Sequence, residues 1–198
     1  MTNEFLVKKR TIEKLKEESD SVYQYATAIF WLNGAVFFFS ILLFTGGLLF
    51  HSTITNLLNG SFHSASLSKI VTLLVSAFTD GQPFNSQRQL NLVHFASNTG
   101  NLALTSGMIA YLSYCISQIF LAIKKGDTPF TSRNISYWRK CSHFFSIIAV
   151  VLFLASFLTH GALLLSVLTP MLLSCFFYCI ALIFEYGSCL QTESDETL

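Results

Sequence analysis

Four apolar runs, each long enough to cross a membrane, constrain the fold of this chain more than any other feature. They cover residues 27–50, 99–123, 141–160 and 162–186. The first run has no ionisable side chain, and as a helix it would be about 36 Å long, against a hydrocarbon core of about 30 Å. The sequence therefore predicts an all-α membrane protein, a bundle of four transmembrane helices in one membrane domain of residues 1–198.

The composition supports a bilayer as the solvent. Of the 198 residues, 52% are hydrophobic and 12% are charged, whereas soluble domains carry about 25% charged residues. A soluble fold of this composition would have too little polar surface to cover its core. We therefore expect a multi-pass integral membrane protein, surrounded by lipid.

The distribution of cations predicts the orientation. Of the 12 Lys and Arg residues, five precede the first run, five lie at residues 124–140, and two lie between the first and second runs. Short loops rich in Lys and Arg stay on the cytoplasmic side. The segment 1–26, the 124–140 loop and the tail 187–198 are therefore predicted to be cytoplasmic, and residues 51–98 to lie outside. Segment 1–26 is expected to be either a short helix on the inner leaflet or a solvated terminus.

The connections carry two further predictions. Residues 67–79 are apolar but would form only about 20 Å of helix, so we expect a short extra helix outside the membrane, followed by a turn at residues 80–83. The link between the third and fourth runs is only His160 and Gly161. Two helices joined so tightly must be antiparallel neighbours.

The small residues of the second run indicate a helix-packing face. They recur at spacings of three and four, which lets helix backbones approach closely in lipid. The stripe consists of Gly100, Ala103, Gly107, Ala110, Tyr114 and Ser117. The alternative is a ligand path through the bundle interior, lined by this stripe together with Asn33, Ser40 and Pro170.

The 124–140 loop contains a helix start. Thr131 follows Pro129 at the position of an N-cap, with Asn134 three residues on. Arg133, Tyr137 and Lys140 then share one side of the helix. This side is either a docking surface for an acidic partner or lipid headgroups, or ordinary charge that sets topology.

Glu185 is the acid nearest to the interior of a predicted span. A charge at the bilayer centre costs roughly 2.5–3.5 kcal/mol on insertion scales, and less near a helix end. We therefore expect Glu185 at the inner interface, in an ion pair with the cations of the 124–140 loop.

The cysteines and histidines give no strong catalytic or metal pattern. The sequence predicts a non-enzymatic protein with no catalytic residue, cofactor or metal, and buried or reduced thiols. A weaker alternative is a membrane thiol oxidoreductase that uses Cys175 and Cys179, which lie four residues apart on one helix face. A site that joins the outer histidines to His160 is a further alternative.

Two stretches resemble a known family. GDTPFTSRN, with Trp138 and Arg139 after it, resembles a "G-x-PFT-x-E-N … L-R" loop, and FEYGSCLQTESDETL resembles an "FE-x-G-x-x-LQ-x-x-x-D-x-T" tail. The chain is identified as a member of the bacterial four-span membrane family called domain of unknown function two-nine-seven-five. Arg133 and Trp138 depart from the family pattern, which tends to have an acid and a Leu there. The candidate residues for partner binding or structure in or beside these two stretches are Asp127, Pro129, Phe130, Thr131, Asn134, Arg139, Glu185, Gly187, Gln191 and Asp195.

The resemblance implies a multi-pass protein of the bacterial cytoplasmic (plasma) membrane, with four spans and no established catalysis. It also implies a small helix-turn-helix regulator as a common genomic neighbour. Our first hypothesis is a non-enzymatic integral membrane protein whose inner face binds a cytoplasmic partner such as that regulator, without binding nucleic acid directly. The alternative is a small transporter, channel or immunity-type protein that acts through the bundle interior.

Overall fold

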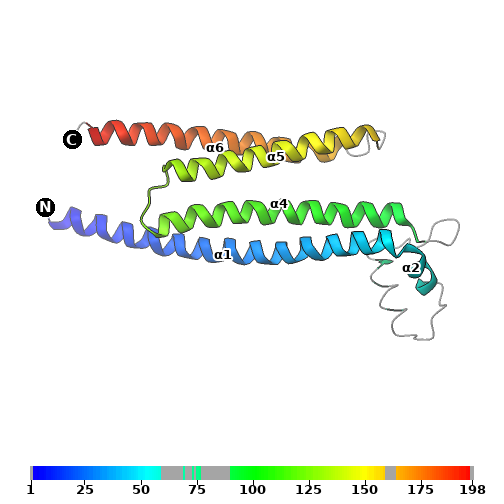
Figure 1. Ribbon diagram of the computed structural model, residues 1–198. Helices are drawn as coiled ribbons and strands as arrows, with labels where there is room; N and C mark the ends of the chain where they lie inside the picture. Colours follow the sequence, from blue (N-terminus) through cyan, green and yellow to red (C-terminus); the bar gives the residue numbers. More distant parts are fainter. Residues whose placement is uncertain are drawn as a thin grey trace. The chain divides into compact units, whose positions relative to one another are not determined.

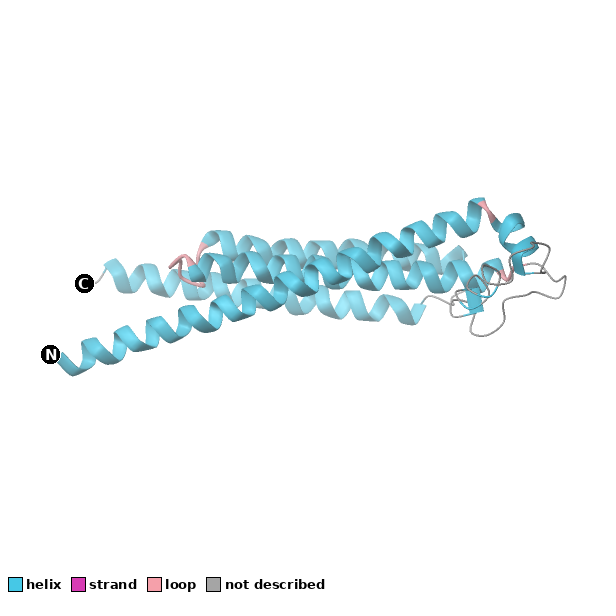
Figure 2. Cartoon of the chain, turned by 90° about the horizontal axis from the view of Figure 1, so that it is seen from below, coloured by secondary structure: helices cyan, strands magenta, loops and turns pink. Residues whose placement is uncertain are grey.

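The computed structural model describes residues 2–58, 69, 73, 75–76, 90–158 and 164–196. Its helices are α1 (Thr2–Leu49), α2 (His51–Leu58), α4 (Leu92–Lys124), α5 (Ser132–Leu158) and α6 (Leu164–Glu196) (Figure 1). Four of these, α1, α4, α5 and α6, are long and apolar enough to cross a membrane. Figure 2 shows the same long helices from a perpendicular direction. The predicted all-α class with four membrane-spanning helices is confirmed.

Each long helix continues beyond the apolar run that predicted it. α1 is a single helix of 48 residues, about 72 Å long, which is more than twice the hydrocarbon core. Segment 1–26 is therefore not a separate short helix, because its described residues continue the first span. At the other end of the chain, α6 runs on to Glu196. Intrahelical hydrogen bonds persist in water, so helices do not stop where the apolar residues stop.

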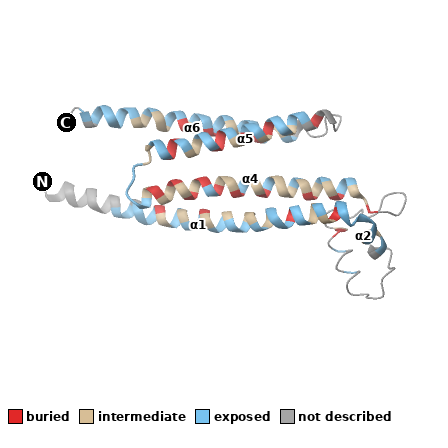
Figure 3. Ribbon diagram, viewed as in Figure 1, coloured by how far each residue is buried: buried red, intermediate tan, exposed pale blue. Residues whose placement is uncertain are grey.

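The chain forms two compact units, which we describe separately. The first consists of Met1–Phe30 and Tyr111–Leu198. In it, α5 and α6 pack along one another in opposite directions (Figure 1), so the predicted antiparallel pairing is confirmed. The core of this pair includes Phe145 on α5 and Phe177 and Ala181 on α6, each at most 4% exposed. Figure 3 shows such buried positions distributed along the helices.

The second unit, Trp31–Ala110, contains the remaining halves of α1 and α4, together with α2. Here the glycines of α4 meet aromatic rings of α1. A Cβ atom added to Gly107 would lie 3.1 Å from the ring of Phe37, and one added to Gly100 would lie 3.9 Å from Phe44. The predicted packing role of these small residues is confirmed, since larger side chains would keep the two helices apart.

Parts of the connections lie outside the described residues. Of the predicted extra helix at 67–79, only Lys69, Leu73, Val75 and Ser76 are described, and these are helical. The turns at 80–83 and at His160 and Gly161 also lie outside the described residues. The short helix α2 was not expected. Its Thr55 hydroxyl accepts a 3.2 Å hydrogen bond from the backbone N–H of Leu90.

The long helices expose large apolar side chains. Phe38 is 65% exposed, Leu172 is 70% exposed, and in the most apolar window of α1 only 6% of the residues are buried. Soluble monomers rarely expose contiguous apolar surface on this scale. These are the features of a multi-pass integral membrane protein.

Candidate functional site

The 124–140 loop begins with a helix stop at the end of α4. Gly126 has a φ of 98°, which only glycine adopts readily. The N–H of Gly126 donates to the carbonyl of Ile123 (2.9 Å), and the N–H of Asp127 donates to that of Ala122 (3.1 Å). This pair of bonds is a Schellman motif. It turns the chain away from α4 and leaves Asp127 exposed.

Thr131 then opens α5, as predicted, but its hydroxyl does not cap the helix. Its backbone carbonyl accepts from the N–H of Ile135 (3.1 Å), and α5 begins at the next residue. The side chain of Asn134 fixes the loop instead. Its Nδ2 donates to the carbonyls of Thr128 (3.4 Å) and Pro129 (3.2 Å), and the residue is fully buried. Asn134 therefore ties the first turn of α5 to the loop before it.

Aromatic contacts join this loop to α6. The ring of Phe130 lies 5.4 Å from that of Phe184, and the indole of Trp138 stacks on Phe177 at 5.7 Å. A Cβ atom added to Gly187 would lie 2.7 Å from two carbons of the Phe130 ring. The two motif stretches, distant in sequence, thus meet. We call this contact of Phe130, Asn134 and Trp138 with Phe184 and Gly187 the loop–tail junction.

An ion pair closes the edge of the junction. The Nη2 atom of Arg139 donates to Oε2 of Glu185 at 2.7 Å, and both side chains are about half exposed. The ion pair predicted for Glu185 is therefore present. A second pair joins α4 to α1, with Nζ of Lys124 2.6 Å from Oδ1 of Asp20 and 5.8 Å from the ring centre of Tyr23.

Three buried polar atoms at the start of α5 have no hydrogen-bond partner among the described groups. They are Oγ1 of Thr131, Oδ1 of Asn134 and Nε1 of Trp138. Their spacing of three and four residues sets them on one face of α5. The arrangement can hold the loop against α6, but it brings no nucleophile and general base together. No group of three metal-ligating side chains occurs in the described part of the chain.

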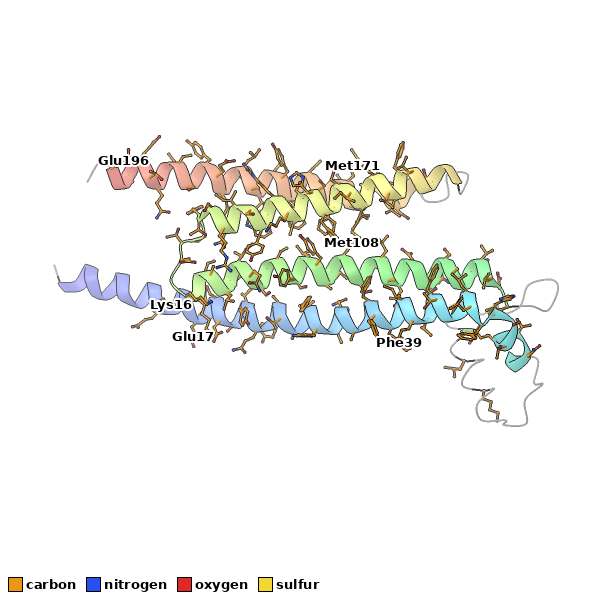
Figure 4. The ribbon with its side chains drawn as sticks, in the orientation of Figure 1. Lys16, Glu17, Phe39, Met108, Met171 and Glu196 are labelled. Carbon is orange, nitrogen blue, oxygen red and sulfur yellow. The ribbon has the colours of Figure 1, made fainter. Side chains whose placement is uncertain are left out.

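The remaining motif residues lie beyond the junction. Gln191 and Asp195 follow Gly187 along α6 by about 6 Å and 12 Å, and Gln191 is exposed. We call residues 188–196 the tail helix. Figures 1 and 2 show it projecting past the start of α5, and Figure 4 labels Glu196 at its end. The sequence correctly placed Glu185 near the loop cations, but it did not show that the Phe130 ring packs against Gly187.

The cysteines occupy two environments. Cys175 and Cys179 are exposed free thiols on α6, whereas Cys115 and Cys141 are free and at most 1% exposed. The sequence did not single out Cys115 and Cys141, because they lie on different helices and share no spacing motif. All five cysteines are free thiols.

A cavity of about 360 Å³ opens between α5 and α6. It is lined mainly by apolar groups, with Ser146 of α5 and Ser174 and Cys175 of α6 as its polar lining. The hydroxyl of Ser174, which lines the cavity, donates to the carbonyl of Ser142 at 3.0 Å. The cavity therefore combines an apolar lining with a serine from each of the two helices.

Comparisons with models of known protein families, with curated proteins and with solved structures found no match to this chain.

Proposed function

We propose that this chain is a non-enzymatic membrane protein whose loop–tail junction holds the tail helix in position to bind a cytoplasmic protein partner. The observation that carries the proposal is the extension of α6 beyond the junction. A contact that only joined α5 to α6 would be complete at Gly187, yet the helix continues for about 13 Å with exposed side chains.

The chemistry of the tail helix indicates the kind of partner. Tyr186 is 67% exposed and Leu190 is 47% exposed, and with a spacing of four residues they share one face of α6. Glu193 and Glu196 follow on the same helix. An amphipathic helix of this kind binds in an apolar groove, and the acids favour a groove with a basic rim. A small helix-turn-helix regulator, the neighbour implied by the family resemblance, would present such a basic surface.

A pull-down from detergent extracts tests the proposal. The full chain is the bait and the neighbouring regulator is the prey. We expect the L190S/E193Q/E196Q variant to recover at least about ten-fold less regulator, since a few residues carry most of the binding energy of an interface. The matched control E13Q/E17Q removes two exposed acids from α1 and should bind as the native chain does. Unchanged recovery with the tail variant would contradict the proposal.

The cavity between α5 and α6 favours a second candidate function, a small transporter, channel or immunity-type protein that acts through the bundle interior. Ser146 lies at its rim, so S146F would fill part of it without replacing a buried residue. Liposomes loaded with a small fluorescent solute measure the activity. Transport by the native chain that S146F abolishes would support this candidate, and liposomes that stay sealed with the native chain would exclude it.

A further inference from the structure

The cations of the 124–140 loop fall into two groups. Lys124 and Arg139 are each neutralised by a neighbouring acid, Asp20 and Glu185, at 2.6 and 2.7 Å. Among the described side chains, the other three take part in no ion pair: Lys125, Arg133 and Lys140. Instead, Nζ of Lys140 lies 5.5 Å from the ring centre of Tyr137. Uncompensated charge therefore remains on α5, outside the loop–tail junction.

Two of these cations continue into an exposed apolar stripe. Arg133, Lys140, Ile147 and Leu154 follow one another at intervals of seven residues, which in a helix keeps them close to one line. All four are exposed, Ile147 by 64% and Leu154 by 59%. Along the helix axis, the stripe is cationic from Arg133 to Lys140, a distance of about 10 Å, and apolar from Ile147 to Leu154.

The charge pattern of this stripe matches a phospholipid. The interfacial layer of a bilayer is about 5–8 Å thick on each side of the core, so Lys140 lies at the depth of the headgroups if the apolar part of α5 fills the core. Arg133 then lies about 10 Å further along the axis, just outside this layer, and its long side chain can reach back to the headgroups. A phosphate between them would be within reach of both long side chains, with the Tyr137 hydroxyl as a further donor. Ile147 and Leu154 would then contact the acyl chain.

A second copy of the chain fits this stripe less well. Copies related by a two-fold axis along the membrane normal would present the same residues to each other. Arg133 and Lys140 of both copies would then face like charges without an acid between them. We infer that the stripe from Arg133 to Leu154 is a binding site for one anionic phospholipid. This inference is independent of the proposed protein partner.

Native mass spectrometry of the full chain in mild detergent tests the inference. The probes are phosphatidylglycerol, phosphatidylcholine and free glycerol phosphate. We expect one tightly bound phosphatidylglycerol, weaker binding of phosphatidylcholine, and no retained glycerol phosphate. The R133Q/K140Q variant should bind phosphatidylglycerol about ten- to thirty-fold more weakly, because each cation near an anionic surface contributes to the attraction.

The matched control K16Q/K125Q removes two exposed cations elsewhere on the first unit and should keep the native affinity. If R133Q/K140Q does not fold, as judged by its thermal transition, K140Q is compared with K125Q instead. The inference would be overturned if the lipid-site variant and its control lost the same affinity for phosphatidylglycerol, or if neither lost any. Equal retention of glycerol phosphate, or a dimer that becomes stronger when Arg133 and Lys140 are neutralised, would also overturn it.

Discussion

Replacing Gly187 by Ala should show whether the loop–tail junction is closely packed. The added Cβ atom would lie 2.7 Å from Cδ1 and Cε1 of Phe130 and 3.3 Å from its Cζ. Carbon atoms in good contact are about 3.5–4.0 Å apart. The ring must therefore move by about 1 Å, and this would disturb its contact with Phe184 at 5.4 Å.

Two opposing free-energy terms decide the result. Overpacking of a well-packed site costs about 1–3 kcal/mol. Ala in place of Gly inside a helix stabilises it by up to about 1 kcal/mol. We expect G187A to lower the free energy of unfolding by about 1 kcal/mol in the native background. Without the Phe130 ring only the helix term remains, so G187A should stabilise the F130A protein.

Equilibrium unfolding in mixed micelles of mild detergent and dodecyl sulfate measures all four proteins of this double-mutant cycle. The expected coupling between Gly187 and Phe130 is about 1–3 kcal/mol. Gly34 provides the control, because a Cβ atom there would meet nothing within 4 Å. G34A should stabilise both backgrounds equally. A G187A effect of the same sign and size with and without the Phe130 ring would refute the packing argument.

Three further predictions concern the same end of the chain and its orientation. R139Q should lower the free energy of unfolding more than E185Q, since it leaves an acid unpaired beside an apolar helix. E185Q should cost less than about 1 kcal/mol, because the pair is half exposed. Equilibrium unfolding of both variants checks this. G126A should cost about 1 kcal/mol or more in the same assay, since its φ is 98°. In a cysteine-free background on intact cells, an impermeant thiol reagent should label S52C but not S132C, both exposed sites, and the reverse pattern would show an inverted orientation.

The sequence was sufficient for the features that the bilayer itself imposes. A core of about 30 Å requires long apolar helices, and these are α1, α4, α5 and α6. The pairing of Glu185 with a loop cation followed from the cost of a lone charge next to lipid. Both predictions depend on the solvent around the chain, so no knowledge of tertiary contacts was needed.

The ends of the helices and the junction depend on contacts that a hydropathy pattern does not contain. Hydropathy marks where lipid ends, whereas helix ends depend on caps, so the start of α1 at Thr2 and the end of α6 at Glu196 were missed. The contact of Phe130 with Gly187 requires the register of α5 against α6. A local signal was nevertheless available, because a glycine inside a helix costs about 1 kcal/mol and usually has a packing reason.

The ion pairs separate two roles that the sequence left open for the loop cations. Orientation is set while the chain inserts, when all five cations act because no tertiary pair has formed. Lipid binding acts on the folded chain, where Lys124 and Arg139 are already paired. The R133Q/K140Q variant leaves eight of the ten cations predicted to lie inside, against two outside, so its orientation should be native. A loss of phosphatidylglycerol binding without inversion would therefore assign Arg133 and Lys140 a role in lipid binding beyond topology.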